Sequence, residues 1–401
     1  MPLPFLKVVP KRALGVHIGP AQIKLVEIER TTREPIITNM VWEETPPEAY
    51  VGSRLENPSA VAAVLTRLLQ THKIRTKLAL AGVDGSEVIA RTIVLPNMPI
   101  KELRKAIMFE TEASLPSGTG DNVLDYAILR TFASEEEAAE KVEVLILSAQ
   151  KQPLGLLAEA LLEAGLKPTA LDLSPVAAHR AESRSPKIRE RGGEYILITI
   201  NDRCTDLTIV FEGRVRLIRS IPIGSMSMMD ALGERHLFDA GMDMRAPSPE
   251  RAGEEEVLHI DKRREEDVEF GPFGEDPFAA EITARDEALA REAVEERDEL
   301  ARLNPIMTEM VDEILNTIRY GQSFGKERSE ITFAVIDGYF PYGEHFVRSM
   351  SDKLGIPTMP GDPLATVRVA ESGIREDLIQ YFAPDFSVAV GLALRGIHQF
   401  G

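Results

Sequence analysis

One strand–turn–strand pattern occurs twice in the chain, and this repetition constrains the fold more than any other feature. The first copy, residues 13–30, reads ALGVHIGPAQIKLVEIER, with apolar side chains at strand spacing on both sides of a Gly-Pro-Ala turn. The second copy, residues 195–224, has two strands about a turn, a tight Glu-Gly reversal and a third alternating strand. At a constant offset, His17 falls on Thr199, Gly19 on Asn201 and Lys24 on Asp206. We therefore interpret the chain as an internal duplication.

Each copy continues with further elements in the same order. Residues 34–42 form a third strand candidate, residues 57–74 have helical apolar spacing behind an Asn-Pro-Ser start signal, and residues 76–83 suit a buried strand. The second copy continues with a helix candidate at 225–238 and, far downstream, a strand at 331–338. Two βββαβ units of this kind predict an α/β protein with two lobes.

A block of different character separates the two units. Its elements follow the order β-α-β-β-α-β, from the strand SEVIARTIVLP at 86–96 to the strand KPTALDL at 167–173, which is typical of a compact α+β module. We therefore expect an N-terminal arm (1–12), a first lobe (13–91 and 174–193), an inserted α+β domain (92–173), a second lobe (194–240 and 301–384), an acidic insertion (241–300) and a C-terminal helix (385–401) that returns to the first lobe.

Acidic side chains are concentrated in residues 241–300. This segment holds about 20 acidic and 8 basic residues, roughly two thirds of the excess behind the formal charge of −18. Because it lacks steady apolar spacing, we expect a largely disordered surface insertion, with an acidic docking arm for a basic partner as the alternative. The overall charge argues against nucleic acid as a main partner, since phosphate contacts require clustered cations.

Cysteine usage and hydropathy indicate a chain from a reducing compartment. The single cysteine, Cys204, excludes a disulfide framework and a cysteine metal site. The start, MPLPFLKVVPKR, has too short an apolar run for a signal peptide, and no stretch reaches the roughly 18 to 20 apolar residues of a membrane span. We assign no metal ligand and no catalytic residue, because the histidines are scattered singly and no P-loop or G-x-G-x-x-G motif occurs.

Three stretches carry a resemblance to a known family. LGVHIGPAQIKLVEI resembles the opening G-x-D-I-G-S-x-x-I-K-L-V-E-L of PilM, the cytoplasmic actin-like protein of type IV pilus assembly. IVLPNMPIKELRKAIMFETEASLP is similar to that family's passage into its inserted small domain, and APDFSVAVGLALRGI is similar to its closing helix. The matches run over 13–240 and 303–397. FtsA and the cytoplasmic part of GspL share the plan, but the chain shows no basic amphipathic tail of the FtsA kind, which favours PilM.

The resemblance implies an actin-like fold, with duplicated RNase H-like lobes and an inserted SHS2-like domain. It also implies a nucleotide site in which backbone N–H groups of the two hairpin turns hold the phosphates. A carboxylate before each turn then holds Mg²⁺ or the attacking water, and a Gly-rich third turn leaves room for adenosine. The positions of this chain that match these roles are Gly19, Gln22 and Lys24 in the first hairpin, Asn201, Asp202 and Thr205 in the second, and Gly338 in the third turn.

All three turns depart from the family pattern. His17 and Thr199 stand where the two carboxylates are expected, and Pro20 removes one N–H from the first turn. Asp202 brings a negative charge that repels polyphosphate, and Tyr339 and Phe340 stand where the third turn leaves space. We therefore expect a degenerate site with no cofactor, or with ATP and Mg²⁺ held only weakly, and we lean against enzymatic activity.

The family resemblance also implies partners and a cellular place. We expect a cytoplasmic scaffold of a type IV pilus or related secretion machine, peripheral to the inner membrane and associated with it only indirectly. It would bind the N-terminal tail of an inner-membrane PilN-like protein, together with other assembly proteins. An active ATP-binding protein whose nucleotide state controls assembly, and an FtsA-like division tether, are the alternatives.

Overall fold

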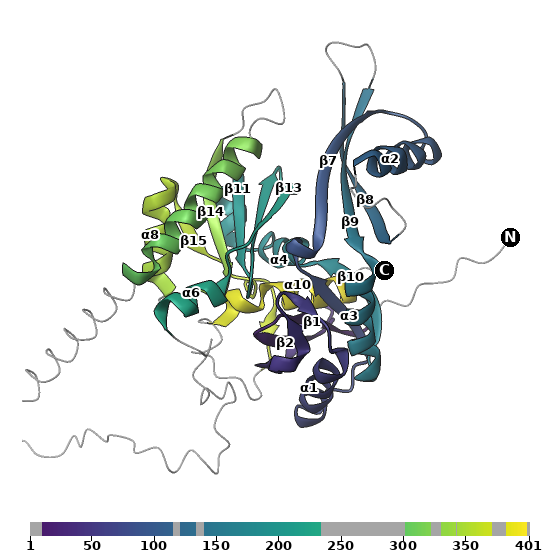
Figure 1. Cartoon of the computed structure of the whole chain (residues 1–401), viewed down its shortest axis with the longest axis vertical. Helices are drawn as coiled ribbons and strands as arrows, with labels where there is room; N and C mark the ends of the chain where they lie inside the picture. Colours follow the sequence, from purple (N-terminus) through teal and green to yellow (C-terminus); the bar gives the residue numbers. More distant parts are fainter. Residues whose placement is uncertain are drawn as a thin grey trace, which may run out of the picture.

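A computed structural model describes residues 10–114, 121–133, 140–233, 301–321, 330–341, 343–370 and 382–398. The acidic insertion expected at 241–300 and most of the expected N-terminal arm lie outside these ranges. Figure 1 shows two lobes, each built on a sheet, and a smaller module that stands beside them. Two helices lie between the lobes, where they contact both.

The first lobe is built on a six-stranded sheet in the order β10-β6-β1-β2-β3-β16. Strands β1, β2 and β3 form an antiparallel meander. Strand β6 pairs in parallel with β1, and β10 pairs in parallel with β6. The strands are β1 Arg12–Ile18, β2 Gln22–Glu29, β3 Ile36–Glu44, β6 Leu78–Val83, β10 Lys167–Leu173 and β16 Arg368–Val369.

The second lobe repeats this topology with the order β13-β12-β11-β14-β15. Strands β11, β12 and β13 form an antiparallel meander. Strand β14 pairs in parallel with β11, and β15 pairs in parallel with β14. The strands are β11 Glu194–Ile200, β12 Thr205–Phe211, β13 Arg214–Ile221, β14 Ile331–Gly338 and β15 Thr358–Pro360. The predicted duplication is therefore confirmed in strand order and direction.

Helices cover the outer face of each sheet. Helices α1 (Pro58–Thr71) and α3 (Lys151–Glu163) share one apolar core with the first sheet. The start signal read from the sequence is real, since the Asn57 side chain accepts the N–H of Ala60 and Pro58 occupies the first turn. The outer face of the second sheet is covered by α6 (Ser225–Leu232), the helical residues 301–321 and α8 (Gly343–Leu354).

The centre of the molecule is a helix pair. Helices α4 (Ser174–Glu182) and α10 (Ser387–His398) pack together in a core that also contains side chains from both sheets. Helix α10 contacts β1, β2 and β6 of the first lobe, where we expected the C-terminal helix. The approach is close because Gly391 has no side chain: a Cβ there would collide with the carbonyl group of Ala177. The short helix α5 (Pro186–Arg191) follows α4.

The small module is a three-stranded sheet, in the order β7-β9-β8, with one helix against it. It consists of β7 Val88–Pro96, α2 Ile100–Ser114, β8 Asn122–Ala133 and β9 Glu140–Gln150. Leu103 and Ile107 of α2 pack on Val142, Val144 and Ile146 of β9. The opposite face of this sheet packs against both lobes, where Leu145 lies in one cluster with Leu173 of β10 and Ile218 of β13.

Two of the expected domain bounds are corrected by the strand pairing. Strand β10 pairs with β6, and α3 packs on α1, so the inserted module ends near residue 150 rather than at 173. Strand β16 falls in the range expected for the second lobe but pairs with β3 of the first. The order of elements along a chain does not say which sheet a strand joins, and this is why the sequence placed both boundaries wrongly.

Candidate functional site

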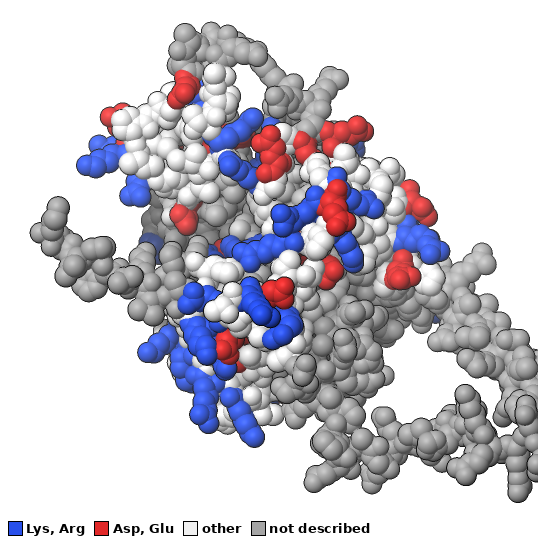
Figure 2. Space-filling view, turned by 180° about the vertical axis from the view of Figure 1, so that it is seen from behind, with Lys and Arg blue, Asp and Glu red and all other residues white. Residues whose placement is uncertain are grey.

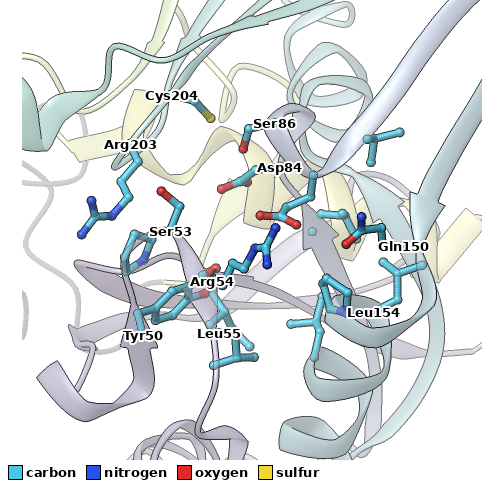
Figure 3. Close-up of a pocket in the computed structure, with 18 of the residues that line it drawn as sticks. Tyr50, Ser53, Arg54, Leu55, Asp84, Ser86, Gln150, Leu154, Arg203 and Cys204 are labelled. Carbon is cyan, nitrogen blue, oxygen red and sulfur yellow. Dashed lines mark hydrogen bonds between the residues drawn. The ribbon is translucent and has the colours of Figure 1, made fainter. Parts of the chain in front are cut away.

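The carboxyl ends of the parallel strands β1, β6, β11 and β14 meet between the lobes. In α/β sheets, ligands bind at such ends. The loop after β6 contains a short helical turn, η2 (Gly85–Glu87), and another, η3 (Ala383–Phe386), precedes α10. Figure 3 shows a pocket of about 470 Å³ at this place, with Asp84 and Ser86 from the loop after β6 and Arg203 and Cys204 from the second hairpin.

The turn of the first hairpin is occupied by a carboxylate of the second. Asp202 Oδ2 accepts the backbone N–H of Ala21 at 2.7 Å and that of Gln22 at 3.3 Å. Gly19 permits this approach, because a Cβ there would collide with the same oxygen. Burial raises the pKa of Asp202, although Lys24 and the Ala21 N–H act against the shift. The N–H groups that hold a phosphate in the family therefore hold a side chain of this chain.

A second carboxylate crosses between the lobes four residues later. Asp206 Oδ2 accepts the N–H of Gly85 at 3.2 Å and the amide of Asn201 at 2.9 Å, while Oδ1 accepts the hydroxyl of Ser220 at 2.7 Å. The side chain is fully buried. Burial and the neighbouring Asp84 raise the pKa of Asp206 to about 7. Asn201 thus orients a carboxylate and does not face an open site.

His17, at the position of the missing first carboxylate, is one partner of a half-buried acid. Its Nε2 lies 3.1 Å from Asp84 Oδ1, which also accepts the hydroxyl of Ser174 at 2.9 Å. Burial alone would raise the pKa of Asp84, but the hydrogen bonds and charge of His17 and the Ser174 hydroxyl hold it below its usual value. Asp84 is therefore ionised and already paired.

Lys24 is also engaged within the fold. Its ammonium group pairs with Asp385 Oδ1, and both side chains are buried. A buried ion pair of this kind leaves no free cation for a phosphate, because removing either partner would leave an uncompensated charge.

The remaining predicted positions, Thr205, Gly338 and Gln22, contact backbone groups or contribute their own. Thr205 donates its hydroxyl to the carbonyl of Ile223 at 2.7 Å. Gly338 has a φ of +89° and lies against the carbonyl of Ile200, where a Cβ would not fit. Gln22 contributes its backbone N–H to Asp202, as described, and its side-chain amide nitrogen has no hydrogen-bond partner within the described residues.

The third turn is more open than the sequence indicated. A cavity of about 920 Å³ beside it is lined by Gly338, Tyr339, Phe340 and Asp385, among others. The Phe340 ring stacks on Phe346 at a centroid distance of 5.5 Å. The two aromatic side chains predicted at this turn line the cavity.

These contacts test whether the residues present fit a nucleotide. Space exists on the adenosine side, but Asp202 and Asp206 satisfy the amides of the phosphate side and occupy it with two buried carboxyl groups. In this conformation the site does not fit a polyphosphate.

Sequence reasoning missed three of the acids, namely Asp84, Asp206 and Asp385. Asp84 directly follows the parallel strand β6, a position where ligand-binding residues are common. Asp206 accepts hydrogen bonds from the amides of Gly85 and Asn201, and Asp385 pairs with the buried Lys24, because buried polar groups require partners.

A second hollow lies between the module and the first lobe. It has a volume of about 810 Å³, and its lining is mainly apolar. Strand β8 contributes Val123, Ala127 and Ile128, and β10 contributes Leu171 and Leu173, with Leu145 and Leu147 of β9 and Val176 of α4 between them. We call it the apolar groove. Its polar lining consists of Asp125, Asp172, Arg214 and Arg395.

The described residues contain neither a metal-binding cluster nor a membrane-spanning helix. Within those ranges, no group of three or more His, Cys, Asp or Glu side chains is arranged to hold a metal ion. None of the described helices is long and apolar enough to cross a bilayer.

Several solved structures are similar to this chain. The PilM-PilN type IV pilus biogenesis complex contains a chain that is 23% identical, with a TM-score of 0.71 over 97% of this chain and 99% of that one. The ethanolamine utilization protein EutJ from Carboxydothermus hydrogenoformans is 13% identical, with a TM-score of 0.46 over 98% and 91%. The activator of 2-hydroxyisocaproyl-CoA dehydratase from Clostridium difficile, solved with bound ADPNP, is 9% identical, with a TM-score of 0.40 over 97% and 95%.

The likeness to the chain of the PilM-PilN complex establishes an actin-like fold with two lobes, as the duplicated sheets indicate. The sequence model of the family described as Type IV pilus assembly protein PilM matches residues 15–242, more than half of the chain and including both hairpins. The chain belongs to the PilM family of type IV pilus assembly proteins.

Proposed function

We propose that this chain is a scaffold that holds the cytoplasmic N-terminal tail of an inner-membrane PilN-like protein in the apolar groove. The observation that carries the proposal is the groove itself, which is large enough for a short apolar segment. The similar chain of known structure was solved as a PilM-PilN complex, which supports a partner of this kind. Such a protein acts on the cytoplasmic side of the inner membrane, together with other pilus or secretion assembly proteins.

The groove suits an extended peptide. Strands β8 and β10 are edge strands of their sheets in the described part of the chain, and both line the groove. A peptide can add its backbone hydrogen bonds to such an edge and place alternate side chains in the hollow. Val123 and Ile128 of β8 are 46% and 47% exposed, so apolar surface is available for contact. Arg214 and Asp125, which also line the groove, can fix the direction of the peptide.

The self-occupied hairpin supports a scaffold that needs no nucleotide. Asp202 and Asp206 connect the second hairpin to amides of the first lobe, a role that phosphates play in an actin-like ATPase. The lobes are thereby held together by the chain itself. The cavity at the third turn favours the alternative, an ATP-binding protein, and a ligand test separates the two.

Calorimetric titration with a synthetic peptide of the cognate tail tests the partner. We expect binding without ATP, and little loss of affinity with added salt because the groove is mainly apolar. Val123→Asp should weaken binding at least tenfold, since it buries a charge in the interface. Val94→Asp is the matched control, because Val94 is 51% exposed on β7 and does not line the groove. No binding by the intact protein, with or without nucleotide, would refute the proposal, as would an equal loss in both variants.

Thermal unfolding with millimolar ATP and Mg²⁺ tests the nucleotide site. We expect no shift in Tm, whereas a ligand at 100 times its Kd would stabilise the fold by about 2.7 kcal/mol. Asp202→Gly frees the N–H groups of Ala21 and Gln22 and is expected to respond more than the parent. A clear, metal-dependent rise in the parent protein would favour the ATP-binding alternative.

A further inference from the structure

Basic side chains gather at the end of the first lobe that faces away from the cleft. We call this surface the basic end and define it as Arg30, Arg33, Lys73, Arg75, Lys77, Lys167 and Arg184. All are exposed except Arg184, which is half-buried. Strand pairing brings them together. Lys167 pairs with Leu78 at the start of β6, and its N–H donates to the carbonyl of Lys77 at 2.6 Å.

The end of α10 joins the remaining members. His398 lies 3.1 Å from Arg184, between its Nε2 and the arginine Nη1. Burial lowers the pKa of His398, and the charges of Arg184 and Arg30 lower it further. The basic end therefore spans the start of β6, the start of β10, the end of β2 and the end of α10.

The acids of this region do not neutralise it. Glu29 is paired with Lys11 and Arg12, and Asp172 is paired with Arg180 and Arg395. Among the described residues, no carboxylate lies within ion-pair distance of Arg30, Arg33, Lys73, Arg75, Lys77 or Lys167. Exposed acids at this end are Glu34 and Glu163. The chain as a whole has a net charge of −18, so this positive surface is local, and it attracts negatively charged partners.

The space-filling view agrees with this distribution. Figure 2 shows blue side chains gathered at the lower left of the face seen from behind, with few red ones among them. That corner corresponds to the lower right of Figure 1, where α1 and α3 lie below β10.

We propose that the basic end docks on anionic phospholipid headgroups of a membrane surface. The choice of a membrane over an acidic polypeptide rests on the proposed function. Strand β10 begins at the basic end with Lys167 and reaches the apolar groove at Leu171–Leu173, a distance of roughly 13 to 20 Å at the usual rise of a strand. A groove that holds the tail of a membrane protein so near to this end must lie close to the bilayer.

The expected strength follows from the number of cations. Each Lys or Arg near an anionic surface contributes roughly fivefold in the partition coefficient, and the effect falls off within a Debye length of about 10 Å at 0.1 M salt. Charges elsewhere on the chain are screened at that distance. Neutralising three members of the basic end should therefore weaken binding roughly 100-fold.

Co-sedimentation of the full chain with lipid vesicles tests the proposal. The probes are vesicles of phosphatidylcholine with 30% phosphatidylglycerol, vesicles of phosphatidylcholine alone and soluble polyglutamate. The test variant is Arg75→Gln/Lys77→Gln/Lys167→Gln. The matched control is Lys101→Gln/Lys105→Gln/Arg348→Gln, which removes the same charge from exposed positions on α2 and α8.

We expect salt-sensitive binding to the anionic vesicles only, lost in the test variant and retained in the control. Absence of binding at low salt, or equal loss in the two variants, would overturn the proposal. Binding of polyglutamate without vesicle binding would do so too and would assign the surface to an acidic protein. The calorimetric titration described above is done in solution without lipid, so failure of the groove and failure of the basic end remain distinguishable.

Discussion

Asp202 and Asp206 stand four residues apart on the second hairpin and reach amides of the other lobe. Backbone N–H donors compensate part of the cost of burying them, as a phosphate oxygen would be compensated in the family site. The rest of the desolvation cost appears as raised pKa values, because burial raises the pKa of Asp202 and that of Asp206. The carboxyl groups of Asp202 and Asp206 therefore take the hydrogen bonds that phosphate oxygens accept in an actin-like ATPase.

The raised pKa of Asp206 predicts a pH effect on stability. With a pKa of about 7 in the folded state and an ordinary value near 4 when unfolded, the folded chain binds an extra proton between these limits. Its contribution to the free energy of unfolding therefore falls as pH rises through that window. Glu182, also raised to about 7 by burial, acts in the same direction. His179, lowered to about 4 by burial, acts the other way but only below pH 6.5.

We accordingly expect urea unfolding to give a lower free energy of unfolding at pH 8 than at pH 6.5. Asp206→Asn should remove about 1 kcal/mol of this change, since the amide oxygen can still accept the Gly85 N–H. The exposed Glu309→Gln serves as the control and should leave the slope unaltered. An unchanged slope in Asp206→Asn would show that another group dominates.

At the scale of the element, the crossing of α4 and α10 depends on one missing side chain. Gly391→Ala places a methyl group against the carbonyl of Ala177, in a core that has no room to move. We expect a loss of about 1–3 kcal/mol in the free energy of unfolding, measured by urea titration. Gly155→Ala is the matched control, because Gly155 lies within α3 with no atom near its missing Cβ. It should stabilise by about 0.5–1 kcal/mol, and equal effects at the two sites would contradict the packing argument.

How much of the fold could be read from the sequence also differs by element. The hairpins and the helix at 58–71 were predictable, because alternation, turn residues and the Asn-Pro cap are local signals. The partner of β10 was not, because pairing with β6 is a contact between residues about 90 positions apart. The site shows the same division. Lys24 and Asp202 were found by their place in a hairpin, whereas their partners Asp385 and the Ala21 amide depend on how the lobes close.

On the scale of the whole molecule, the lobes are joined by the central helix pair and by the two acids of the cleft. These acids predict a measurable closure. In Asp202→Ala/Asp206→Ala the amides of Ala21, Gln22 and Gly85 lose their acceptors, so hydrogen exchange in peptides that contain them should become faster.

The exposed Asp230→Ala on α6 is the control for that experiment and should leave these peptides unaffected. Exchange at the same rate in the double variant and the parent would mean that the helix pair alone keeps the lobes closed. Faster exchange restored to the parent rate by ATP would show that a phosphate can replace the carboxylates.

The way the small module is attached has a consequence for how the chain folds. Its first residue, Val88, pairs with Ala149 next to its last, so the insertion closes on itself. When the roughly 60 residues between them are set aside, β6 and β10 are separated by little more than α3, which makes the connection an ordinary βαβ crossover. Loop-closure entropy grows only with the logarithm of loop length, and a self-closed insertion adds even less. The part of the first lobe from β1 to β10 can therefore assemble at the rate its own short connections allow, and a different module could be spliced in at the same place without slowing it.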